Sequence, residues 1–430
     1  MKTSVLILAA GLGTRMKSNN PKVLQKICSK AMILHILKQA YKISDDVCVV
    51  LSYQKEKVEQ VILENFPQTR FLEQDLKNYP GTAGALRGYE SKYEKVLILC
   101  GDMPLVKAKD LEKIALNNSD FNVAVFKTKD AKSYGRIILN EEKIERIIEC
   151  KDANEEELKI KVCNSGVYAI KSSILKEILP LIKNENKAKE YYLTDAVFLA
   201  KEKGYIIKAV FVNEQDFMGV NDKFDLCLAQ DLMQKEIKKE WMKKGVIFHM
   251  PQTTFISDEA EFIGECEIYE NVRIEGKSKI INSIIKSSCV IEDSTIEDSD
   301  VGPLAHLRPK CYLKNTHIGN FVECKNALLN GVKAGHLSYL GDCEIDEGTN
   351  IGCGTITCNY DGIKKHKTKI GKNVFVGSDT QFIAPINIED EVIIAAGSTV
   401  YKNVSKGSLY INRTKAEIKQ EFFYQKLGKK

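Results

Sequence analysis

A glycine-containing loop after the first apolar run is the first place where the residue types could do chemistry. The run Val5–Leu8 leads into Gly11 and Gly13, and Arg15 and Lys22 follow closely. Two glycines after a strand let backbone N–H groups approach an anion, and a helix start favours negative charge. The third glycine of a dinucleotide fingerprint and the lysine–serine pair of a P-loop are missing. The loop predicts an anion site, although glycine pairs also occur in purely structural strand–turn–helix units.

A polar segment in the C-terminal half offers a second kind of chemistry. His336 is one of only six histidines, and it stands beside Gly335 in the most polar stretch of this half. Imidazole has an unperturbed pKa of about 6.5, which suits a general base. A lone histidine is more often structural, so the residue type alone leaves both roles open.

Spacing identifies the element that carries His336. From residue 370 to 400 every sixth residue is apolar, which is typical of a parallel β-helix built from hexapeptide repeats. Shorter runs with the same spacing begin near residue 268. The register slips near Gly302–Pro303 and around 359–367, and such slips predict loops that leave the coil and often bind ligands. The longest run consists of Ile370, Val376, Phe382, Ile388, Ile394 and Val400.

The N-terminal half alternates apolar runs with helical segments. Continuous apolar strands separated by helices indicate a parallel sheet covered on both faces, with ligands at the carboxyl ends of its strands. The runs are Val5–Leu8, Val47–Leu51, Val96–Cys100, Val123–Phe126 and Ile206–Val212.

One long helix is expected between the two halves. Apolar residues fall at near-helical spacing from Asp222 to Lys244, where Asp222 can cap the start and Gly245 can end the helix. Residues Glu417 to Leu427 predict a short helix that could cover the open end of the β-helix. The expected domains are therefore 1–222, a helical linker over 223–245, and 246–430.

Composition narrows the class of protein. The net charge of +5 is too small for a general nucleic-acid binder, and no apolar run approaches the roughly 20 residues of a membrane helix. The N-terminal apolar run is too short for a signal peptide, and Arg15 follows it closely. Thirteen scattered cysteines without a CxxC pair indicate reduced thiols. We expect a cytoplasmic protein without stable membrane insertion.

Longer motifs in the first half resemble those of sugar-phosphate nucleotidyltransferases. The resemblance rests on the whole loop Leu8–Met16, on Pro21–Leu24, on Leu99–Leu105 and on Gly219–Asn221. It implies a Rossmann-like α/β domain in which Asp102 and Asn221 bind Mg²⁺. It also implies a site for UTP and the UDP-sugar made of Leu8, Ala9, Ala10, Gly11, Arg15, Lys22, Gln74, Gly81, Thr82, Gly101, Asp102, Gly135, Glu149, Asn164 and Asn221.

This first half departs from the family pattern in one segment. The stretch between Gln74 and Gly81 is longer than usual, and Gly84 stands where the family usually has a histidine.

The second half resembles the acetyltransferase half of the bifunctional N-acetylglucosamine-1-phosphate uridyltransferase/glucosamine-1-phosphate N-acetyltransferases, the GlmU family. The resemblance implies a left-handed β-helix in which His336 is the general base and Glu323 orients its imidazole. It implies that glucosamine 1-phosphate is bound by Arg308, Lys325, Tyr339, Asn350 and Lys365. It implies that acetyl-CoA is bound by Cys353, Asn359, Tyr360, Ser378, Ala396 and Arg413, with Cys353 at a position where the family usually has alanine.

The two resemblances together imply one bifunctional enzyme of UDP-N-acetylglucosamine synthesis. Acetyl transfer to glucosamine 1-phosphate would precede Mg²⁺-dependent uridylyl transfer from UTP to N-acetylglucosamine 1-phosphate, with release of pyrophosphate. The product would feed bacterial peptidoglycan and lipopolysaccharide synthesis, and the family forms homotrimers. Two alternatives are a nucleotidyltransferase with one activity and a structural or regulatory β-helix, and a non-enzymatic trimerisation scaffold.

Overall fold

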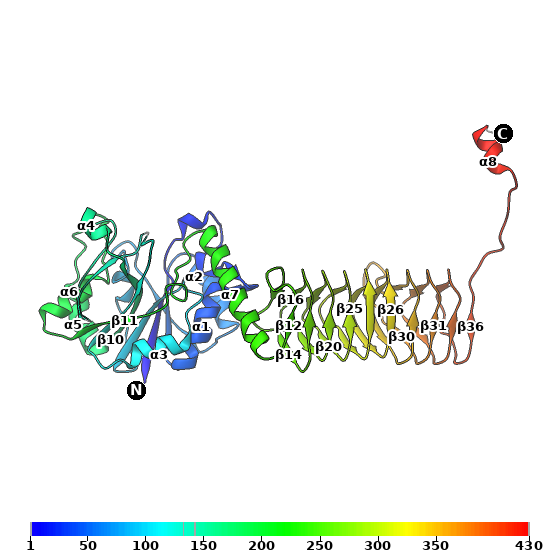
Figure 1. Cartoon of the computed structure of the whole chain (residues 1–430), viewed down its shortest axis with the longest axis horizontal. Helices are drawn as coiled ribbons and strands as arrows, with labels where there is room; N and C mark the ends of the chain where they lie inside the picture. Colours follow the sequence, from blue (N-terminus) through cyan, green and yellow to red (C-terminus); the bar gives the residue numbers. More distant parts are fainter. Residues whose placement is uncertain (1, 132, 142, 429–430) are drawn as a thin grey trace. The chain divides into compact units, whose positions relative to one another are not determined.

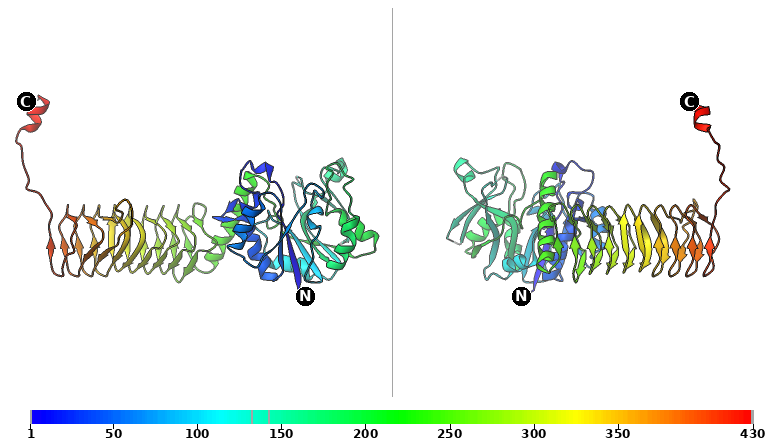
Figure 2. Two further views of the ribbon diagram at one scale, coloured as in Figure 1. Left: turned by 180° about the vertical axis from the view of Figure 1, so that it is seen from behind. Right: turned by 45° about the vertical axis from the view of Figure 1, so that its right-hand side comes forward.

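A computed structural model describes residues 2–131, 133–141 and 143–428, which form two compact units (Figures 1 and 2). The first unit extends to Met233 and the second begins at Gln234. This boundary lies inside the long helix α7, Lys223–Lys243.

The first unit is built on one mixed sheet that contains nine strands among the described residues. Strand β1 pairs in parallel with β4 on one side and β6 on the other, as expected for the first apolar runs. The sheet order is β5 (Arg70–Glu73), β4 (Val47–Leu51), β1 (Thr3–Leu8), β6 (Lys95–Cys100), β10 (Val162–Lys171), β7 (Phe121–Lys127), β11 (Ile207–Phe211), β9 (Lys143–Ile148) and β8 (Arg136–Asn140). A separate short hairpin joins β2 (Lys26–Ile27) and β3 (Lys30–Ala31).

The sheet separates two apolar cores because alternate side chains of each strand point to opposite faces. Val5 and Ile7 of β1 belong to one core, and Leu6 belongs to the other. The first core includes residues of α1 (Met32–Ile43), α2 (Lys55–Leu63) and α3 (Ala108–Leu116). The second core includes residues of α5 (Ser172–Ile178) and α6 (Asp195–Glu202). The short helix α4 (Glu155–Leu158) buries no residue and belongs to neither core.

The expectation of a wholly parallel sheet is wrong for its centre. Strand β10 runs antiparallel to both β6 and β7, and the hairpin β8–β9 adds further antiparallel pairs. The apolar pattern hid β10 because Asn164, Ser165 and Gly166 interrupt it. At this point the register of β10 shifts, and these polar residues reach the carboxyl end of the sheet.

The second unit is a solenoid of stacked coils whose strand pairs are all parallel among the described ladders (Figure 1). One face is a ten-stranded sheet made of β12 (Ile247–Phe248), β15 (Glu267–Ile268), β18 (Ile284–Ile285), β21 (Asp300–Val301), β24 (His317–Asn320), β26 (Lys333–His336), β28 (Asn350–Ile351), β31 (Phe375–Val376), β34 (Ile393–Ile394) and β36 (Leu409–Tyr410).

Two more faces share a second sheet, because the long strands β25 (Glu323–Asn330) and β27 (Tyr339–Ile345) pair along both. One face also contains β13 (Phe255–Ile256), β16 (Arg273–Glu275), β19 (Val290–Glu292), β22 (His306–Leu307), β29 (Ile356–Cys358), β32 (Gln381–Ile383) and β35 (Thr399–Val400). The other contains β14 (Glu261–Ile263), β17 (Lys279–Ile281), β20 (Thr295–Glu297), β23 (Tyr312–Lys314), β30 (Thr368–Ile370) and β33 (Ile386–Ile388).

The hexapeptide prediction is confirmed by the core of this solenoid. The sixth-position residues of the longest run are buried and form one apolar cluster with residues from the preceding coils. Of the two expected loops, the one around 359–367 is present, because the chain leaves the coil between Cys358 and Thr368. The loop expected near Gly302–Pro303 is wrong: β22 begins five residues after β21 ends, the same spacing as between β18 and β19.

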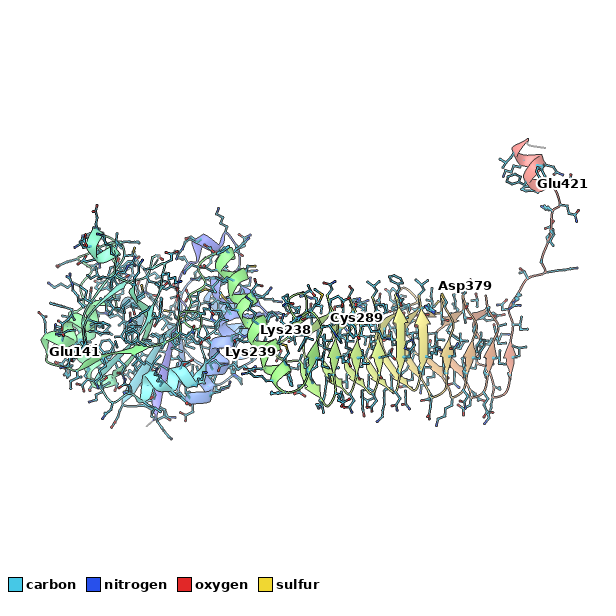
Figure 3. The ribbon with its side chains drawn as sticks, viewed as in Figure 1. Glu141, Lys238, Lys239, Cys289, Asp379 and Glu421 are labelled. Atoms are coloured by element: carbon cyan, nitrogen blue, oxygen red, sulfur yellow. The ribbon has the colours of Figure 1, made fainter. Side chains whose placement is uncertain are left out.

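Helix α7 covers the first coils of the solenoid with its C-terminal half. The side-chain amide of Gln234 bonds to the backbone of Ile256 in the way that a neighbouring strand would. It donates to the Ile256 carbonyl and accepts from the Ile256 N–H. The Lys238 ammonium (Figure 3) donates to the carbonyls of Pro251 and Thr254. These bonds satisfy polar groups that the first coil would otherwise leave unpaired. As predicted, Asp222 caps the start of α7, where it accepts from the Asp225 N–H.

The predicted C-terminal helix is shorter than expected and does not cover the solenoid. Helix α8 spans Phe422–Leu427 and buries none of its residues. Its apolar residues Phe422, Phe423, Tyr424 and Leu427 are about half exposed or more. No helix in the described ranges is long and apolar enough to cross a membrane.

Candidate functional site

The first site lies where the neighbouring parallel strands β1 and β6 end side by side. Leu8 pairs with Cys100, and the Gly101 N–H donates to the Leu8 carbonyl at 2.8 Å. A Cβ on Gly101 would lie 2.9 Å from the Cβ of Ala9, so only glycine allows this approach. The glycine loop that follows Leu8 is thereby brought next to Asp102.

Four polar side chains from three loops meet at this point. The Lys22 ammonium lies 2.5 Å from Asp102 Oδ2 and 3.2 Å from Asn221 Oδ1. The Arg15 guanidinium donates to the same Asn221 oxygen at 2.9 Å. The Val220 N–H donates to the Asp102 carbonyl at 2.8 Å, which ties the two loops together.

These residues fit the Mg²⁺ that the resemblance to sugar-phosphate nucleotidyltransferases implies. The Lys22 ammonium contacts one oxygen of Asp102 and one oxygen of Asn221, so these two oxygens lie close enough together to bind one cation. Carboxylate and amide oxygens are hard ligands, and Mg²⁺ usually keeps other positions for water and substrate phosphates. No group of three or more histidine, cysteine or acidic ligands occurs in the part of the chain that the structure describes.

A cavity of about 580 Å³ opens beside this cluster. Most residues predicted to bind the nucleotide line it, namely Leu8, Ala9, Ala10, Gly11, Arg15, Lys22, Gln74, Gly81, Thr82, Asp102 and Asn221. Gly101 does not line this cavity; it provides the close strand contact described above.

The longer loop after Gln74 and the glycine at position 84 are one structural feature. The Gln74 side-chain amide donates to the carbonyls of Tyr79 and Gly81, which closes the loop. The loop then lies so close to residue 84 that a Cβ there would stand 2.0 Å from the Tyr79 carbonyl oxygen. A histidine at position 84 has no room in this arrangement. This packing gives a physical reason for the departure from the family pattern.

A smaller hollow of about 200 Å³ adjoins the cavity and contains the predicted sugar-binding residues Gly135, Glu149 and Asn164. Burial raises the pKa of the Glu149 carboxyl, which accepts a hydrogen bond from Thr194. Asn164 donates to the Tyr168 hydroxyl and accepts from the Gly166 N–H. The hollow is therefore lined by oriented polar groups.

Several lining residues were not predicted from the sequence. Cys100 lines both hollows, and burial raises the pKa of its thiol to about 12. Glu190 lines the larger cavity, and Thr194 lines the smaller one. The segment 190–194 is held against the loop that follows Gln74, since the Leu193 N–H donates to the Thr82 hydroxyl. The run of polar and aromatic residues just before α6 is the feature of the sequence that could have indicated a binding segment.

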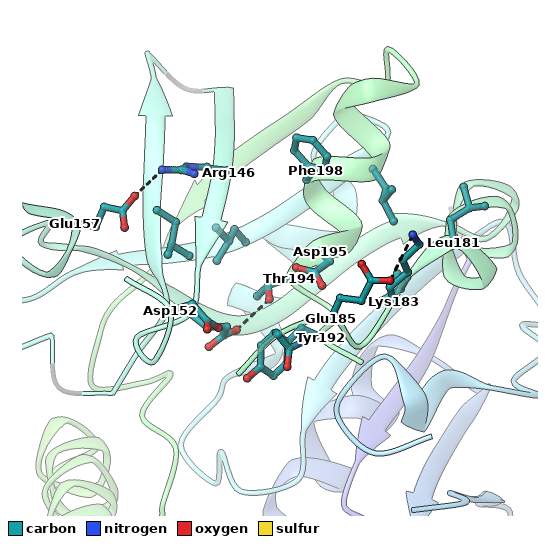
Figure 4. Close-up of a pocket in the computed structure, with 16 residues that line it drawn as sticks. Arg146, Asp152, Glu157, Leu181, Lys183, Glu185, Tyr192, Thr194, Asp195 and Phe198 are labelled. Carbon is teal, nitrogen blue, oxygen red and sulfur yellow. Dashed lines mark hydrogen bonds and ion pairs between the residues drawn. The ribbon is translucent and has the colours of Figure 1, made fainter. Parts of the chain in front are cut away.

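A third hollow of about 710 Å³ (Figure 4) shares Glu149 and Thr194 with the smaller hollow, and no residue of the glycine loop lines it. Its lining includes the ion pair Arg146–Glu157 and the carboxyl of Asp195. Burial, and then the charge of Asp152, raise the pKa of Asp195. The hollow lacks the glycine loop and the cluster around Asp102, so we assign the chemistry to the smaller cavities.

The second site lies at a corner of the solenoid, at the end of β26. His336 is exposed there and pairs in register with Asn320 of the preceding coil. Hydrogen bonds join the same corner of later coils, from Gly354 to Leu337, from Asp379 to Cys353 and from Gly397 to Ser378. The corner therefore stacks four predicted residues from successive coils, namely His336, Cys353, Ser378 and Ala396. The Arg413 guanidinium donates to the Ala396 carbonyl at 3.2 and 3.1 Å.

Three cations lie close together around Lys325, on the neighbouring coils. The neighbouring ammonium of Lys365 and the guanidinium of Arg308 lower the pKa of Lys325. Glu323 accepts from Arg308 at 3.2 Å and pairs in register with Tyr339, which starts the strand after His336. Cations held this close together form a binding site for an anion such as a phosphate.

The loop that leaves the coil after Cys358 is ordered by one carboxylate. Backbone N–H groups of Lys364 and Ile363, together with His366, lower the pKa of Asp361. Asn359 of this loop donates to Asp342. Tyr360 is exposed, with its hydroxyl bonded to the Gly362 carbonyl. Two of the predicted acetyl-CoA residues thus stand on a structured loop.

Asn350, the remaining predicted glucosamine-1-phosphate residue, lies on the ten-stranded face. It starts β28 and pairs with Lys333 of the preceding coil. It is three residues before Cys353, so it approaches the corner of His336 from one side.

Comparison with known proteins places both halves in one family. A MobA-like NTP transferase domain model matches residues 5–186, and a bacterial transferase hexapeptide model matches residues 367–402. The Campylobacter lari protein named "Bifunctional protein GlmU" is 86% identical over 429 residues, 100% of each chain. The protein of the same name from Campylobacter jejuni serotype O:6 is 71% identical, again over 100% of both chains. That from Campylobacter concisus is 59% identical over 99% of this chain and 98% of its own. The chain belongs to the GlmU family of bifunctional proteins.

Proposed function

We propose that each unit holds one of the two active sites of this bifunctional enzyme. The enzyme transfers an acetyl group from acetyl-CoA to glucosamine 1-phosphate and a uridylyl group from UTP to N-acetylglucosamine 1-phosphate. The uridylyl site is the cavity at the ends of β1 and β6, and the acetyl site is the solenoid corner at His336. The observation that carries this assignment is that two clusters of cationic and polar side chains lie in different units.

In the first site, the chain's own residues hold two anionic substrates together. Arg15, Lys22 and the glycine-loop N–H groups bind the triphosphate, while Asp102 and Asn221 bind Mg²⁺. When bound, Mg²⁺ supplies positive charge that stabilises the negative charge developing at the phosphates. The sugar phosphate oxygen attacks the α-phosphorus, the P–O bond to the β-phosphate breaks, and pyrophosphate leaves. No side-chain nucleophile is required, because positioning and electrostatics provide the catalysis.

The smaller hollow positions the N-acetylglucosamine moiety. Glu149, Asn164 and Gly135 all line this hollow, so a carboxyl and an amide side chain face the bound sugar. A buried carboxyl such as Glu149 can accept a hydrogen bond from a sugar hydroxyl. Gln74, Gly81 and Thr82 lie at the larger cavity, where they contact the nucleoside.

In the second site, His336 acts on the amino group of glucosamine 1-phosphate. Its imidazole accepts a proton as the nitrogen attacks the thioester carbonyl, the carbon–sulphur bond breaks, and the proton returns to the departing thiolate of CoA. Arg308, Lys325 and Lys365 bind the sugar phosphate, with Tyr339 and Asn350 beside the sugar. Glu323 holds Arg308 and supplies negative charge near the imidazolium.

Acetyl-CoA lies along the later coils of the same corner. Cys353, Ser378 and Ala396 follow His336 in successive coils, and Arg413 is fixed on the Ala396 carbonyl. Asn359 and Tyr360 of the neighbouring loop complete this contact surface. The acetyl group is placed at Cys353, one coil from the general base.

A bulky thiol reagent is expected to block acetyl transfer more strongly than uridylyl transfer. Cys353 and Cys100 are both partly exposed, but desolvation raises the pKa of the Cys100 thiol to about 12, which makes it a poor nucleophile in the uridylyl site. Both activities are measured after treatment with N-ethylmaleimide, with the exposed Cys227 providing an unrelated target. A Cys353→Ala enzyme should keep its acetyl transfer after treatment. Equal loss of the two activities would contradict the assignment.

We also propose that the enzyme is a homotrimer that assembles through the solenoid. Phe375, Ile393 and Leu409 are paired in register on the ten-stranded face, and each is half exposed or more. Such a row of apolar side chains favours contact with another protein surface. Light scattering is expected to give three times the chain mass of 48.4 kDa. A mass of one chain at working concentration would contradict this proposal.

The proposed location is the cytoplasm. All thirteen cysteines lie in the described ranges, and no disulfide joins any two of them there. Persistently reduced thiols are typical of that compartment.

The arrangement at the solenoid corner argues against an enzyme with uridylyl transfer alone. A structural or regulatory solenoid has no need to hold three cations together, nor to expose a histidine at the end of a strand in the same region. Glucosamine 1-phosphate, acetyl-CoA, UTP and Mg²⁺ are therefore expected to give UDP-N-acetylglucosamine and pyrophosphate. If only N-acetylglucosamine 1-phosphate served as the sugar substrate, the single-activity alternative would hold.

A further inference from the structure

The Lys22 ammonium occupies the position between the two proposed metal ligands. It contacts Asp102 Oδ2 at 2.5 Å and Asn221 Oδ1 at 3.2 Å. Mg²⁺ binds its oxygen ligands at about 2.0–2.1 Å. A metal ion on these two oxygens would lie almost where the nitrogen now is, so the two cations exclude one another.

The surrounding chain holds Lys22 in this position. Its side chain is 12% exposed and that of Asp102 is 24% exposed, so water screens the ion pair only partly. A Cβ on Gly13 would stand 2.6 Å from the Cβ of Lys22, so only glycine at position 13 leaves room for the Lys22 side chain. Arg15 adds a second positive charge at the Asn221 oxygen.

We propose that Lys22 is a positioning residue that blocks the metal position until the phosphates of the nucleotide draw its ammonium away. This inference rests on the proposed function of the same site. Mg²⁺ then enters with the triphosphate and does not bind tightly to the free enzyme.

Charge makes this exchange favourable only when the nucleotide is present. In the free site, the Lys22 ammonium neutralises Asp102, and an incoming divalent cation meets two like charges, from Lys22 and Arg15. A triphosphate that lies against the glycine loop offers both cations several negative oxygens. Lys22 can then leave Asp102, and the carboxylate becomes available to the metal that the nucleotide carries.

The first test measures Mn²⁺ binding in the absence of nucleotide, by the loss of the free-ion signal in electron paramagnetic resonance. Mn²⁺ takes oxygen ligands in the same octahedral geometry as Mg²⁺. A charge-assisted hydrogen bond of the kind that Lys22 makes contributes roughly 1.5–3 kcal/mol, which corresponds to about 10- to 100-fold in affinity. Lys22→Met is expected to tighten Mn²⁺ binding by about this factor.

Two matched variants decide whether the gain arises at Asp102. Lys17→Met removes the same charge from an exposed position of the same loop and should leave the Mn²⁺ affinity at the wild-type value. The double variant Lys22→Met/Asp102→Asn should lose the gain. An equal gain in Lys17→Met, or no gain in Lys22→Met, would overturn the inference.

A second measurement uses the unaltered enzyme, so its result does not depend on whether a variant folds correctly. By calorimetry, UTP is expected to bind in the presence of EDTA, because the released cations hold its phosphates. Mn²⁺ alone should give no saturable binding at concentrations that saturate Lys22→Met. Tight Mn²⁺ binding by the unaltered enzyme, abolished in Asp102→Asn, would overturn the inference while leaving the metal assignment intact. A gain in Lys22→Met that survives Asp102→Asn would instead overturn the metal assignment itself.

Discussion

Replacing His336 with alanine is expected to reduce acetyl transfer by about 10²- to 10⁴-fold, which is the usual contribution of a positioned general base. The nitrogen of glucosamine 1-phosphate must lose a proton as it attacks the thioester, and His336 is the group at the solenoid corner that can accept it. Uridylyl transfer should stay at the wild-type rate, because that site is built entirely from residues of the first unit. Each activity is measured separately, with release of CoA and of pyrophosphate as the two readouts.

A second histidine of the solenoid provides the control for this variant. His249 is exposed and pairs with Glu267 in the first coils, away from the cation cluster. His249→Ala should keep both activities. If His336→Ala retained acetyl transfer while folded, the assignment of the general base would be wrong, and loss of both activities in a folded protein would contradict the separation of the two sites.

Replacing Asp102 with asparagine is expected to have the opposite effect. The substitution removes the only carboxylate among the side chains that meet beside the glycine loop in the described structure, and with it the charge that binds Mg²⁺. Metal stabilisation of transferring phosphates contributes several kcal/mol, so uridylyl transfer should fall by roughly a thousandfold or more. Acetyl transfer should be unchanged. Pyrophosphate release at saturating N-acetylglucosamine 1-phosphate is the measurement.

The matched control for Asp102→Asn is Asp45→Asn. Asp45 is exposed and pairs with Lys92, outside the nucleotide cavity. This variant should keep full uridylyl transfer. An Asp102→Asn enzyme whose rate stayed near the wild-type value, with unchanged dependence on Mg²⁺, would contradict the proposed metal site.

The spacing of apolar residues predicted the fold of the second unit well. A period of six admits neither a helix nor an ordinary strand, and the residues from Ile370 to Val400 at that spacing are buried in the solenoid core. The hairpin and the antiparallel strand of the first unit could not be predicted in the same way. Polar residues at 164–166 break the apolar pattern of β10 because they face the sugar pocket.

Site residues that lie close along the chain were easier to predict than contacts between distant segments. The glycine loop with Arg15 and Lys22 is visible as one string, and it lines the nucleotide cavity. Glu190 and Cys100 were missed, because their approach to that cavity depends on how strand ends and the segment before α6 pack. The contact of Lys22 with Asp102, which spans eighty positions, has no signature in the sequence at all.

The helix at the C-terminus shows another limit. Its apolar residues suggested a cover for the solenoid, but Phe422–Leu427 buries none of them within this chain. A sequence pattern identifies an apolar face without saying whether the partner surface belongs to the same chain.

Mixing the two single-site variants tests the central claim, that two independent sites share one chain, most directly. Neither His336→Ala nor Asp102→Asn alone should make UDP-N-acetylglucosamine from glucosamine 1-phosphate, acetyl-CoA, UTP and Mg²⁺. An equal mixture of the two proteins should restore the product, because N-acetylglucosamine 1-phosphate made by one protein can diffuse to the other. A mixture of folded proteins that stays inactive, even when N-acetylglucosamine 1-phosphate is supplied, would contradict two separate active sites.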